Sequence, residues 1–274
     1  MSEQRNFTGF EIAIIGMAGR FPGAKNVVEY WENLVKGKES ISFFTDEELL
    51  EAGVEPSDLN NPNYVKANGY LAGIEYFDSF FFGFTDGEAS LLDPQARIFL
   101  ECTWNGLEDA GYVPNTYNGL IGLFAGASNN FEWEALGLIP RDTNLLGQSA
   151  VQVLANKDFL CGWVAYKLDL KGPSYTISTA CSTSLVAIHA ACQAILNGEC
   201  DMSIAGGVNA TGLHKSGYIT HEGLPYSPDG HVHAFDAGPH GIIGGNGVAV
   251  VVLKRFEDAI KDRDHIYALI KGSA

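Results

Sequence analysis

Basic residues are scarce in this sequence. Lysine and arginine together number 17 against 33 aspartates and glutamates, which leaves a formal net charge of −16 at pH 7. Because binding to nucleic acid or to an anionic membrane depends on clustered basic side chains, this balance argues against both as partners. An acidic protein partner is predicted to need a local basic patch that acts against the overall field.

Paired cysteine motifs and long apolar runs are also missing. The sequence has an odd number of cysteines, five, and no CxxC pair. This count disfavours a disulfide framework and a thiolate zinc site, and it fits a reducing compartment. No apolar stretch precedes Glu11, so there is no signal-peptide pattern, and no run of 18 apolar residues occurs. We therefore expect a soluble cytoplasmic protein.

The residues that are present are typical of a globular protein. Hydrophobic residues make up 46% of the 274 positions, enough for a substantial core in one large domain or two small ones. Apolar β-forming runs alternate with helical patterns, and this alternation predicts an α/β fold with largely parallel strands. Strands are predicted at residues 11–17, 120–128, 174–179, 201–209, 247–256 and 265–274, and helices at 27–37, 94–112, 149–168, 182–196 and 257–262.

Cys181 has a setting that the other four cysteines lack. It lies at the junction between the β-branched run 174–179 and an alanine-rich helix predicted to begin at about Ser182. The first N–H groups of a helix have no internal partners and carry partial positive charge, which favours a thiolate and can stabilise an oxyanion. The alternative is that Cys181 is a small packed hydrophobe, which is the interpretation adopted for Cys102, Cys161, Cys192 and Cys200.

No histidine is linked to Cys181 by its position in the sequence. His189 lies eight residues further on, about 12 Å along a helix axis, which is too far for a hydrogen bond. The helix itself has small side chains on several faces, which predicts burial on most sides. We therefore interpret His189 as a packed side chain.

Three other patterns have functional and structural interpretations. The histidines at 231, 233 and 240, with Asp236, have the spacing of metal ligands, but the surrounding SPDGHVHAFDAGPHG is rich in turn formers, so we predict a turn and no metal. The glycine-rich GIIGGNG matches neither a P-loop nor a dinucleotide-binding motif. The aromatic FDSFFFGF favours core or interface packing.

Several stretches together resemble the β-ketoacyl synthases, the condensing enzymes of fatty acid and polyketide assembly. TACSTSLVAIHAACQAI resembles their nucleophile motif, and EIAIIGMAGRFPGA, FDSFFFGFTDGEASLLDPQARIFLECTWNGLEDAGY, IGLFAGAS, AGGVN and SPDGHVHAFDAGPHGIIGGNGVAVVVLKRFEDA agree in order and spacing. The sequences of these motifs are most similar to those of ketosynthase domains of modular polyketide synthases, including modules served by a separately encoded acyltransferase. The resemblance covers residues 11–274 and leaves 1–10 as an N-terminal extension.

The resemblance implies a thiolase-like layered αβαβα fold, of which this chain would form the N-terminal half and part of the following segment. It implies that Cys181 accepts an acyl chain from the phosphopantetheine arm of an acyl carrier protein and supplies one oxyanion donor through its N–H. The acyl chain then condenses with a malonyl-type extender with loss of carbon dioxide. It implies a homodimer that pairs through SYTIST, and no bound cofactor.

The sequence departs from the family pattern in one large respect. The family's two catalytic histidines belong to the second half of the domain, and none of the seven histidines here lies in an HGTGT-like motif. We therefore expect little or no condensation from this chain alone, and a need for the remaining half of the ketosynthase. The alternative is a non-catalytic scaffold or dimerisation subunit for a separate catalytic chain. Asn246 stands where many relatives carry glutamate, and no role is assigned to it.

Overall fold

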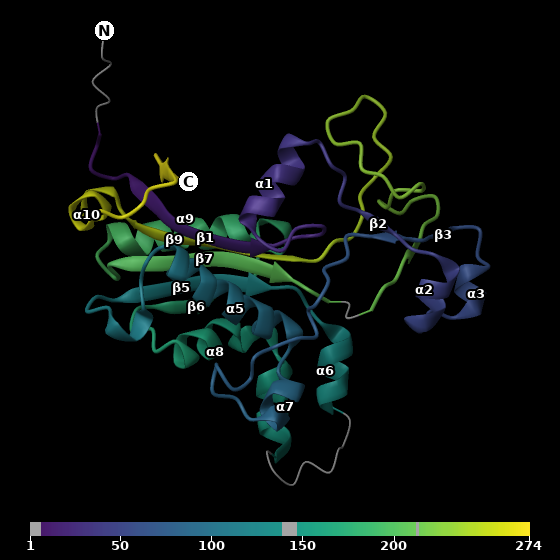
Figure 1. Cartoon of the computed structure of the whole chain (residues 1–274), viewed down its shortest axis with the longest axis horizontal. Helices are drawn as coiled ribbons and strands as arrows, with labels where there is room; N and C mark the ends of the chain where they lie inside the picture. Colours follow the sequence, from purple (N-terminus) through teal and green to yellow (C-terminus); the bar gives the residue numbers. More distant parts are fainter. Residues whose placement is uncertain (1–6, 139–146, 212–213) are drawn as a thin grey trace. The chain divides into compact units, whose positions relative to one another are not determined.

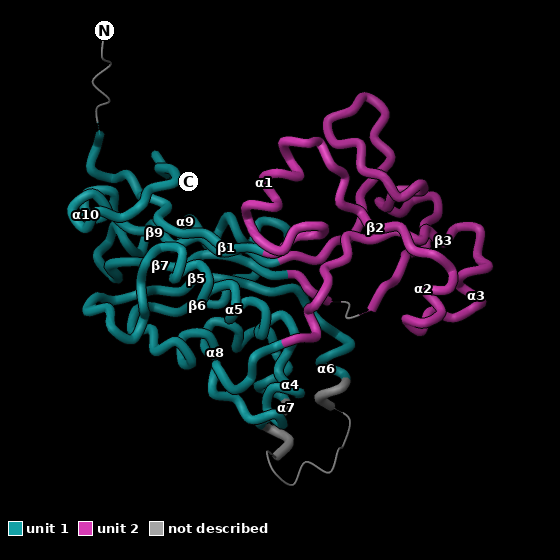
Figure 2. Tube along the Cα trace, in the orientation of Figure 1, with its two compact units in different colours: residues 1–19, 77–208, 248–274 teal, residues 20–76, 209–247 magenta. Residues whose placement is uncertain are grey.

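The computed structural model describes residues 7–138, 147–211 and 214–274 (Figure 1). The chain forms two compact units (Figure 2). Unit 1 consists of residues 1–19, 77–208 and 248–274, and unit 2 consists of residues 20–76 and 209–247. Of the N-terminal extension predicted at 1–10, residues 1–6 lie outside the described residues.

Unit 1 is built around a six-stranded sheet with the order β10-β1-β9-β7-β5-β6. β5 pairs in parallel with β6 and β7, whereas β10 pairs antiparallel with β1. The strands are β1 (Ile12–Arg20), β5 (Ile121–Ala127), β6 (Ser174–Thr176), β7 (Met202–Asn209), β9 (Gly247–Arg255) and β10 (Ala268–Ile270). The six predicted strands are therefore present, and the predicted α/β class is confirmed.

Helices cover both faces of this sheet. On β9, Val250 and Val252 lie beside Gly106 of helix α5 (Pro94–Asp109), whereas Val251 and Leu253 belong to the apolar cluster of helix α9 (Thr183–Leu196). Because successive side chains of a strand point to opposite faces, α5 and α9 lie on opposite sides of the sheet. The other helices of unit 1 are α4 (Asp86–Leu91), α6 (Phe131–Leu138), α7 (Gly147–Ala155), α8 (Leu160–Lys167) and α10 (Phe256–Asp262), with 3-10 turns at Pro114–Thr116 (η1), Lys157–Phe159 (η2) and Ala180–Ser182 (η3).

Several predicted elements have other bounds in the structure, such as β1, which continues to Arg20, three residues beyond its predicted end, and three elements differ more. The single helix predicted at 149–168 is divided into α7 and α8, because Asn156 leaves the helical conformation and its side chain accepts a hydrogen bond from Asp158 N. The strand predicted at 174–179 ends at Thr176, where the chain begins the turn toward Cys181. The strand predicted at 265–274 is paired only over Ala268–Ile270.

Helix α9 is buried against the sheet and exposed mainly near its N-terminal end. Ala187, Ala191 and Ala194 are 0–3% exposed and pack in a cluster with Phe124 of β5. Small side chains let the helix axis approach the sheet closely, so that the core here is dense. Leu185, in contrast, is 70% exposed. Within α9 only Ser184, Leu185 and Leu196 are exposed and the other residues are buried or half-buried, so the predicted burial on most sides holds except at these positions.

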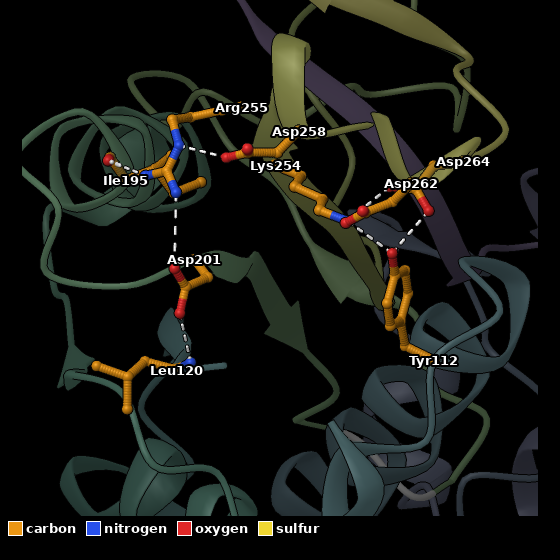
Figure 3. A network of polar contacts seen from close by, with 9 residues as sticks. All are labelled: Tyr112, Leu120, Ile195, Asp201, Lys254, Arg255, Asp258, Asp262 and Asp264. Carbon is orange, nitrogen blue, oxygen red and sulfur yellow. Dashed lines mark hydrogen bonds and ion pairs between the residues drawn. The ribbon is translucent and has the colours of Figure 1, made fainter. Parts of the chain in front are cut away.

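A buried cation lies at the end of β9 (Figure 3). Lys254 is 1% exposed, and its Nζ donates to Tyr112 Oη at 2.6 Å, to Asp262 at 2.6 Å and to Asp264 at 2.9 Å. Burial lowers the pKa of Lys254, but these hydrogen bonds outweigh it and hold the pKa above its ordinary value. Through Lys254, the network joins Asp262 of α10 and Asp264 after it to Tyr112, which lies just after the end of α5.

Arg255, the next residue, closes the C-terminal end of α9 (Figure 3). Its Nη1 donates to Ile195 O at 3.1 Å, and its guanidinium also pairs with Asp258 and Asp201. Asp201 in turn accepts from Leu120 N at 2.8 Å. A cation at a helix C-terminus complements the partial negative charge of the unpaired carbonyl groups, so this contact anchors α9 at one end.

Unit 2 has short elements joined by long loops. The side chain of Asn26 caps the N-terminus of α1 (Val27–Val35), and a capping box formed by Thr45 and Glu48 starts α2 (Asp46–Glu51). α3 (Pro56–Leu59) follows, and the strands form two antiparallel pairs, β2 (Ser42–Phe43) with β4 (Ala67–Asn68) and β3 (Tyr64–Val65) with β8 (Tyr218–Ile219). The apolar stripe of α1 is exposed, with Val28 at 69% and Trp31 at 65%.

Across residues 7–138, 147–211 and 214–274, no helix combines the length and the apolar character needed to cross a membrane.

Candidate active site

The five cysteines fall into two classes. Four are buried, with exposures of 1–2%, and only Cys181 is exposed. Burial raises the pKa of Cys161, Cys192 and Cys200 to about 11. Because the thiolate is the nucleophilic form, these three thiols are unreactive at neutral pH. The packing interpretation of the four buried cysteines is therefore confirmed.

Cys181 lies in a strained turn between β6 and α9. The preceding residue, Ala180, has a φ of 52°, in the left-handed region that non-glycine residues rarely adopt. Such a residue costs about 1–2 kcal/mol and persists only where its surroundings hold it. The turn continues as the 3-10 segment Ala180–Ser182, and α9 begins at Thr183. Cys181 thus lies two residues before the first residue of the helix, which comes one position later than the start predicted at Ser182.

Hydroxyl groups hold this turn in place. Thr183 Oγ1 accepts from Thr179 N at 2.9 Å and donates to Ala180 O at 2.8 Å. Ser182 Oγ donates to Thr179 O at 2.8 Å. Ser182 makes no side-chain cap to the N-terminus of α9, so its hydroxyl group does not neutralise the partial positive charge of the helix end. The local geometry therefore suits an anionic sulfur or oxygen beside Cys181.

Two glycines let the sheet meet this turn. A Cβ on Gly126, near the end of β5, would lie 2.0 Å from Ile177 O and 2.5 Å from Thr183 Cγ2, and a Cβ on Gly207 of β7 would lie 3.3 Å from Ser184 Cβ. Ile177 N also donates to Ala125 O at 2.8 Å. The turn therefore abuts the carboxyl ends of two parallel strands, the edge where α/β proteins place their sites. Neither glycine was among the predicted site residues, although LFAGAS and AGGVN both place small residues at strand ends.

The histidines make their contacts elsewhere. His189 Nδ1 lies 3.0 Å from Ser273 Oγ. In unit 2, His231 Nδ1 lies 2.9 Å from Glu39 Oε2, and His233 Nε2 lies 3.9 Å from Asp229 Oδ2. These two histidines and His240 occupy a loop and no strand, as the turn formers predict. Within the described ranges, no group of three histidine, cysteine or acidic residues is placed to hold a metal ion.

Comparison with known proteins places this geometry in a family. Residues 10–259 match the family model of the β-ketoacyl synthase N-terminal domain. The chain is 44% identical over 270 residues to a phenolphthiocerol/phthiocerol polyketide synthase of Mycobacterium tuberculosis, a match that covers 96% of this chain and 18% of that protein. It is 38% identical over 265 residues to polyketide synthase PksN of Bacillus subtilis, a match that covers 95% of this chain and 5% of that protein.

Solved structures agree with these relatives. Ketosynthase twelve of the bacillaene polyketide synthase from Bacillus amyloliquefaciens superposes with a TM-score of 0.89 at 40% identity, over 97% of this chain and 46% of that one. The ketosynthase from module 1 of the bacillaene synthase of the same species gives 0.82 at 37% identity, again over 97% and 46%. The predicted thiolase-like fold is confirmed, and the chain spans under half of these ketosynthases. The chain belongs to the β-ketoacyl synthase family and resembles the ketosynthase domains of modular polyketide synthases.

Proposed function

We propose that this chain is the acyl-accepting portion of a β-ketoacyl synthase of polyketide biosynthesis, with Cys181 as its nucleophile. The observation that carries the proposal is that Cys181 alone of the five cysteines is exposed, and that it lies in a braced turn at the start of α9. Reactive cysteines occupy such accessible helix N-termini, whereas structural cysteines are buried and inert.

The chemistry begins with transfer of an acyl group. The Cys181 thiolate attacks the carbonyl carbon of an acyl thioester on the phosphopantetheine arm of a carrier protein. The carbonyl oxygen becomes an oxyanion, which the Cys181 N–H and the N-terminus of α9 stabilise. The bond from that carbon to the pantetheine sulfur then breaks, and the pantetheine thiolate leaves and takes up a proton.

The condensation step is proposed to need residues beyond this chain. A malonyl-type extender loses carbon dioxide, its α-carbon attacks the acyl carbon, and the Cys181 thiolate is released. Two histidines in the remaining half of the ketosynthase would support decarboxylation and stabilise the developing negative charge. The uncovered face of α9 around Leu185 and the 46% coverage of the solved ketosynthase both support a second portion that packs here.

A second role, dimerisation, has its own support. β6 forms one edge of the six-stranded sheet, and Tyr175 on it is 56% exposed. An edge strand presents unpaired N–H and C=O groups that another strand can satisfy. We propose that β6 pairs with its counterpart in a second copy, which would place two Cys181 turns near one interface. Pairing through β6 is compatible with acyl transfer at Cys181. If the chain is a non-catalytic scaffold, pairing through β6 is its one role.

The decisive experiment maps where an acyl group attaches. The assembled ketosynthase that contains this chain is incubated with an acyl-pantetheine thioester, and its peptides are analysed by mass spectrometry. We expect the acyl group on Cys181, its loss in Cys181→Ala, and its retention in Cys192→Ala, which removes a buried thiol from the same helix. Acylation of Cys192 or Cys102 with Cys181 left free would show the proposal to be wrong.

A further inference from the structure

A buried polar network lies at the start of α5, outside the Cys181 turn and outside the proposed dimer strand β6. Asp93, Gln95, Arg97 and Asn130 are 3%, 1%, 8% and 5% exposed. Asp93 caps α5: its Oδ1 accepts from Gln95 N at 2.9 Å and from Asn130 Nδ2 at 3.2 Å, and its Oδ2 accepts from Gln95 Nε2 at 3.2 Å. Polar groups this deeply buried are costly unless all are paired, so the network is specific in its geometry.

Gln95 reaches from this network to the strand that abuts the Cys181 turn. Its Nε2 donates to Ser128 O at 2.9 Å, and its Oε1 accepts from Ser128 N at 3.2 Å. A carboxamide donates from its nitrogen and accepts at its oxygen, so it can bind both polar atoms of one backbone residue. The same N–H of Ser128 also donates to Val208 O of β7 at 3.2 Å. Gln95 therefore fixes the chain where it leaves β5.

Ser128 lies two residues along the chain from the point where β5 meets the turn 177–183, which carries the proposed nucleophile Cys181 and is called the nucleophile turn below. That point is Gly126, which lies against Ile177 O and Thr183 Cγ2 without room for a Cβ. Thr183 in turn holds Thr179 N and Ala180 O by its hydroxyl group. A shift of the β5 exit would therefore be transmitted directly to the strained turn that carries Cys181.

The network also fixes where α6 begins. Asn130 Oδ1 accepts from Trp133 N at 3.3 Å, which caps α6, and Trp133 Nε1 donates to Leu91 O at 2.9 Å. The guanidinium of Arg97 lies 5.1 Å from the centroid of the Trp133 ring, and its Nε donates to Leu92 O. Asp93 N donates to Leu154 O of α7. Helices α6 and α7 are thus both joined by hydrogen bonds to residues at or just before the start of α5.

We propose that Gln95 is a positioning residue for acylation of Cys181, which acts through Ser128 and Gly126 by holding the β5 exit against the nucleophile turn. The inference rests on the proposed function, because it assumes that Cys181 accepts the acyl group. Displacement of a reacting group by about 1 Å can cost about 100-fold in rate. Loss of this brace therefore slows acylation without altering any group that contacts the thioester.

The test compares two substitutions in α5 in the assembled ketosynthase. Gln95→Met keeps the volume but removes the two contacts to Ser128 and the hydrogen bond to Asp93 Oδ2. Thr103→Val removes another buried hydrogen bond of α5, from Thr103 Oγ1 to Phe99 O. We expect Gln95→Met to lower the saturating rate of Cys181 acylation by an acyl-pantetheine thioester about 10-fold or more, with the half-saturating concentration unchanged within about twofold. Thr103→Val is expected to acylate at the wild-type rate although it too lowers the melting temperature.

A readout independent of acylation separates this inference from the proposed function. Amide hydrogen exchange of residues 177–183 is expected to be faster in Gln95→Met and unchanged in Thr103→Val. If Gln95→Met does not fold, Gln95→Asn, which keeps the amide but shortens it by one methylene, is expected to show both effects at smaller size. Wild-type exchange and acylation in the Gln95 variants, or equal slowing in Thr103→Val, would overturn the inference. A wild-type protein that is never acylated at Cys181 would instead overturn the proposed function.

Discussion

The two ends of helix α9 are built in opposite ways. At the C-terminal end, Arg255 binds Ile195 O and is itself paired with Asp201 and Asp258. At the N-terminal end, Ser182 provides no side-chain cap, and the preceding Cys181 is exposed after a residue with positive φ. One end is thus neutralised and anchored, and the other keeps its partial charge and a free thiol. This asymmetry fits the role proposed for Cys181, because a rigid support and an unsatisfied helix terminus both favour a reactive thiol.

The largest expected effect concerns two cysteines of this helix region. Burial raises the pKa of Cys192 to about 11, so that at pH 8 about one thiol in 1,000 is a thiolate. We expect iodoacetamide to alkylate the buried Cys192 in the native protein at least about 100-fold more slowly than the exposed Cys181, because Cys192 has both little thiolate and little access to the reagent. The rate of alkylation of Cys192 should rise about tenfold per pH unit up to about pH 11, because the fraction of thiolate rises tenfold per pH unit below the pKa.

Time-resolved peptide mass spectrometry measures both rates in one sample. In urea the two cysteines should react alike, because burial no longer separates them. Native rates within about tenfold of each other at pH 8 would contradict the distinction between the two sites.

The next effect tests the close approach of β5 to the nucleophile turn. Gly126→Ala places a Cβ 2.0 Å from Ile177 O, so the turn must move. We expect Cys181 acylation to slow by about 100-fold, since a displacement of about 1 Å suffices for this. The rate is measured by mass spectrometry at saturating acyl-pantetheine thioester.

Gly162→Ala in α8 is the matched control, because no atom lies within 4 Å of the Cβ that it adds. It should acylate normally and should leave stability unchanged or raise it by up to about 1 kcal/mol, since alanine is the better helix former. Normal acylation in Gly126→Ala would mean that the turn does not depend on this contact.

The smallest effect concerns the anchored end. Arg255→Met keeps the aliphatic stem but removes the contact to Ile195 O and both ion pairs. Because the Arg255 side chain is 34% exposed, we expect the free energy of unfolding to fall by only about 1 kcal/mol. Acylation of Cys181 should change by less than about twofold, because the proposed nucleophile lies at the opposite end of the helix.

Urea unfolding followed by circular dichroism gives the stability change. Lys261→Met removes an exposed cation of α10 that does not cap α9, and it should leave stability within about 0.5 kcal/mol of wild type. A loss of acylation in Arg255→Met as large as that expected for Gly126→Ala would show that the two ends are not independent.

Much of unit 1 could be predicted from local sequence. The alternation of apolar strands and helices identified the six strands and α9, because periodicity and start signals act over a few residues. The division of the predicted helix 149–168 at Asn156 was missed, because the apolar pattern continues across the break. In unit 2, the apolar stripe of Val28 and Trp31 predicted a helix, yet both side chains are exposed. An apolar stripe indicates which face of a helix would be buried, but it does not show that a second segment covers that face.

The sequence by itself determined the order of strands and helices, the family, and the one cysteine at a strand-to-helix junction. Each of these depends on patterns among residues that are close together in the sequence. Only the tertiary structure decided that Ala180 takes a positive φ, that Gly126 must lack a side chain, and that Gln95 binds Ser128. Gln95 and Ser128 are 33 positions apart in the chain. The physical reason is that contacts of this kind depend on how strands and helices pack, and no short-range pattern encodes which distant backbone a side chain will meet.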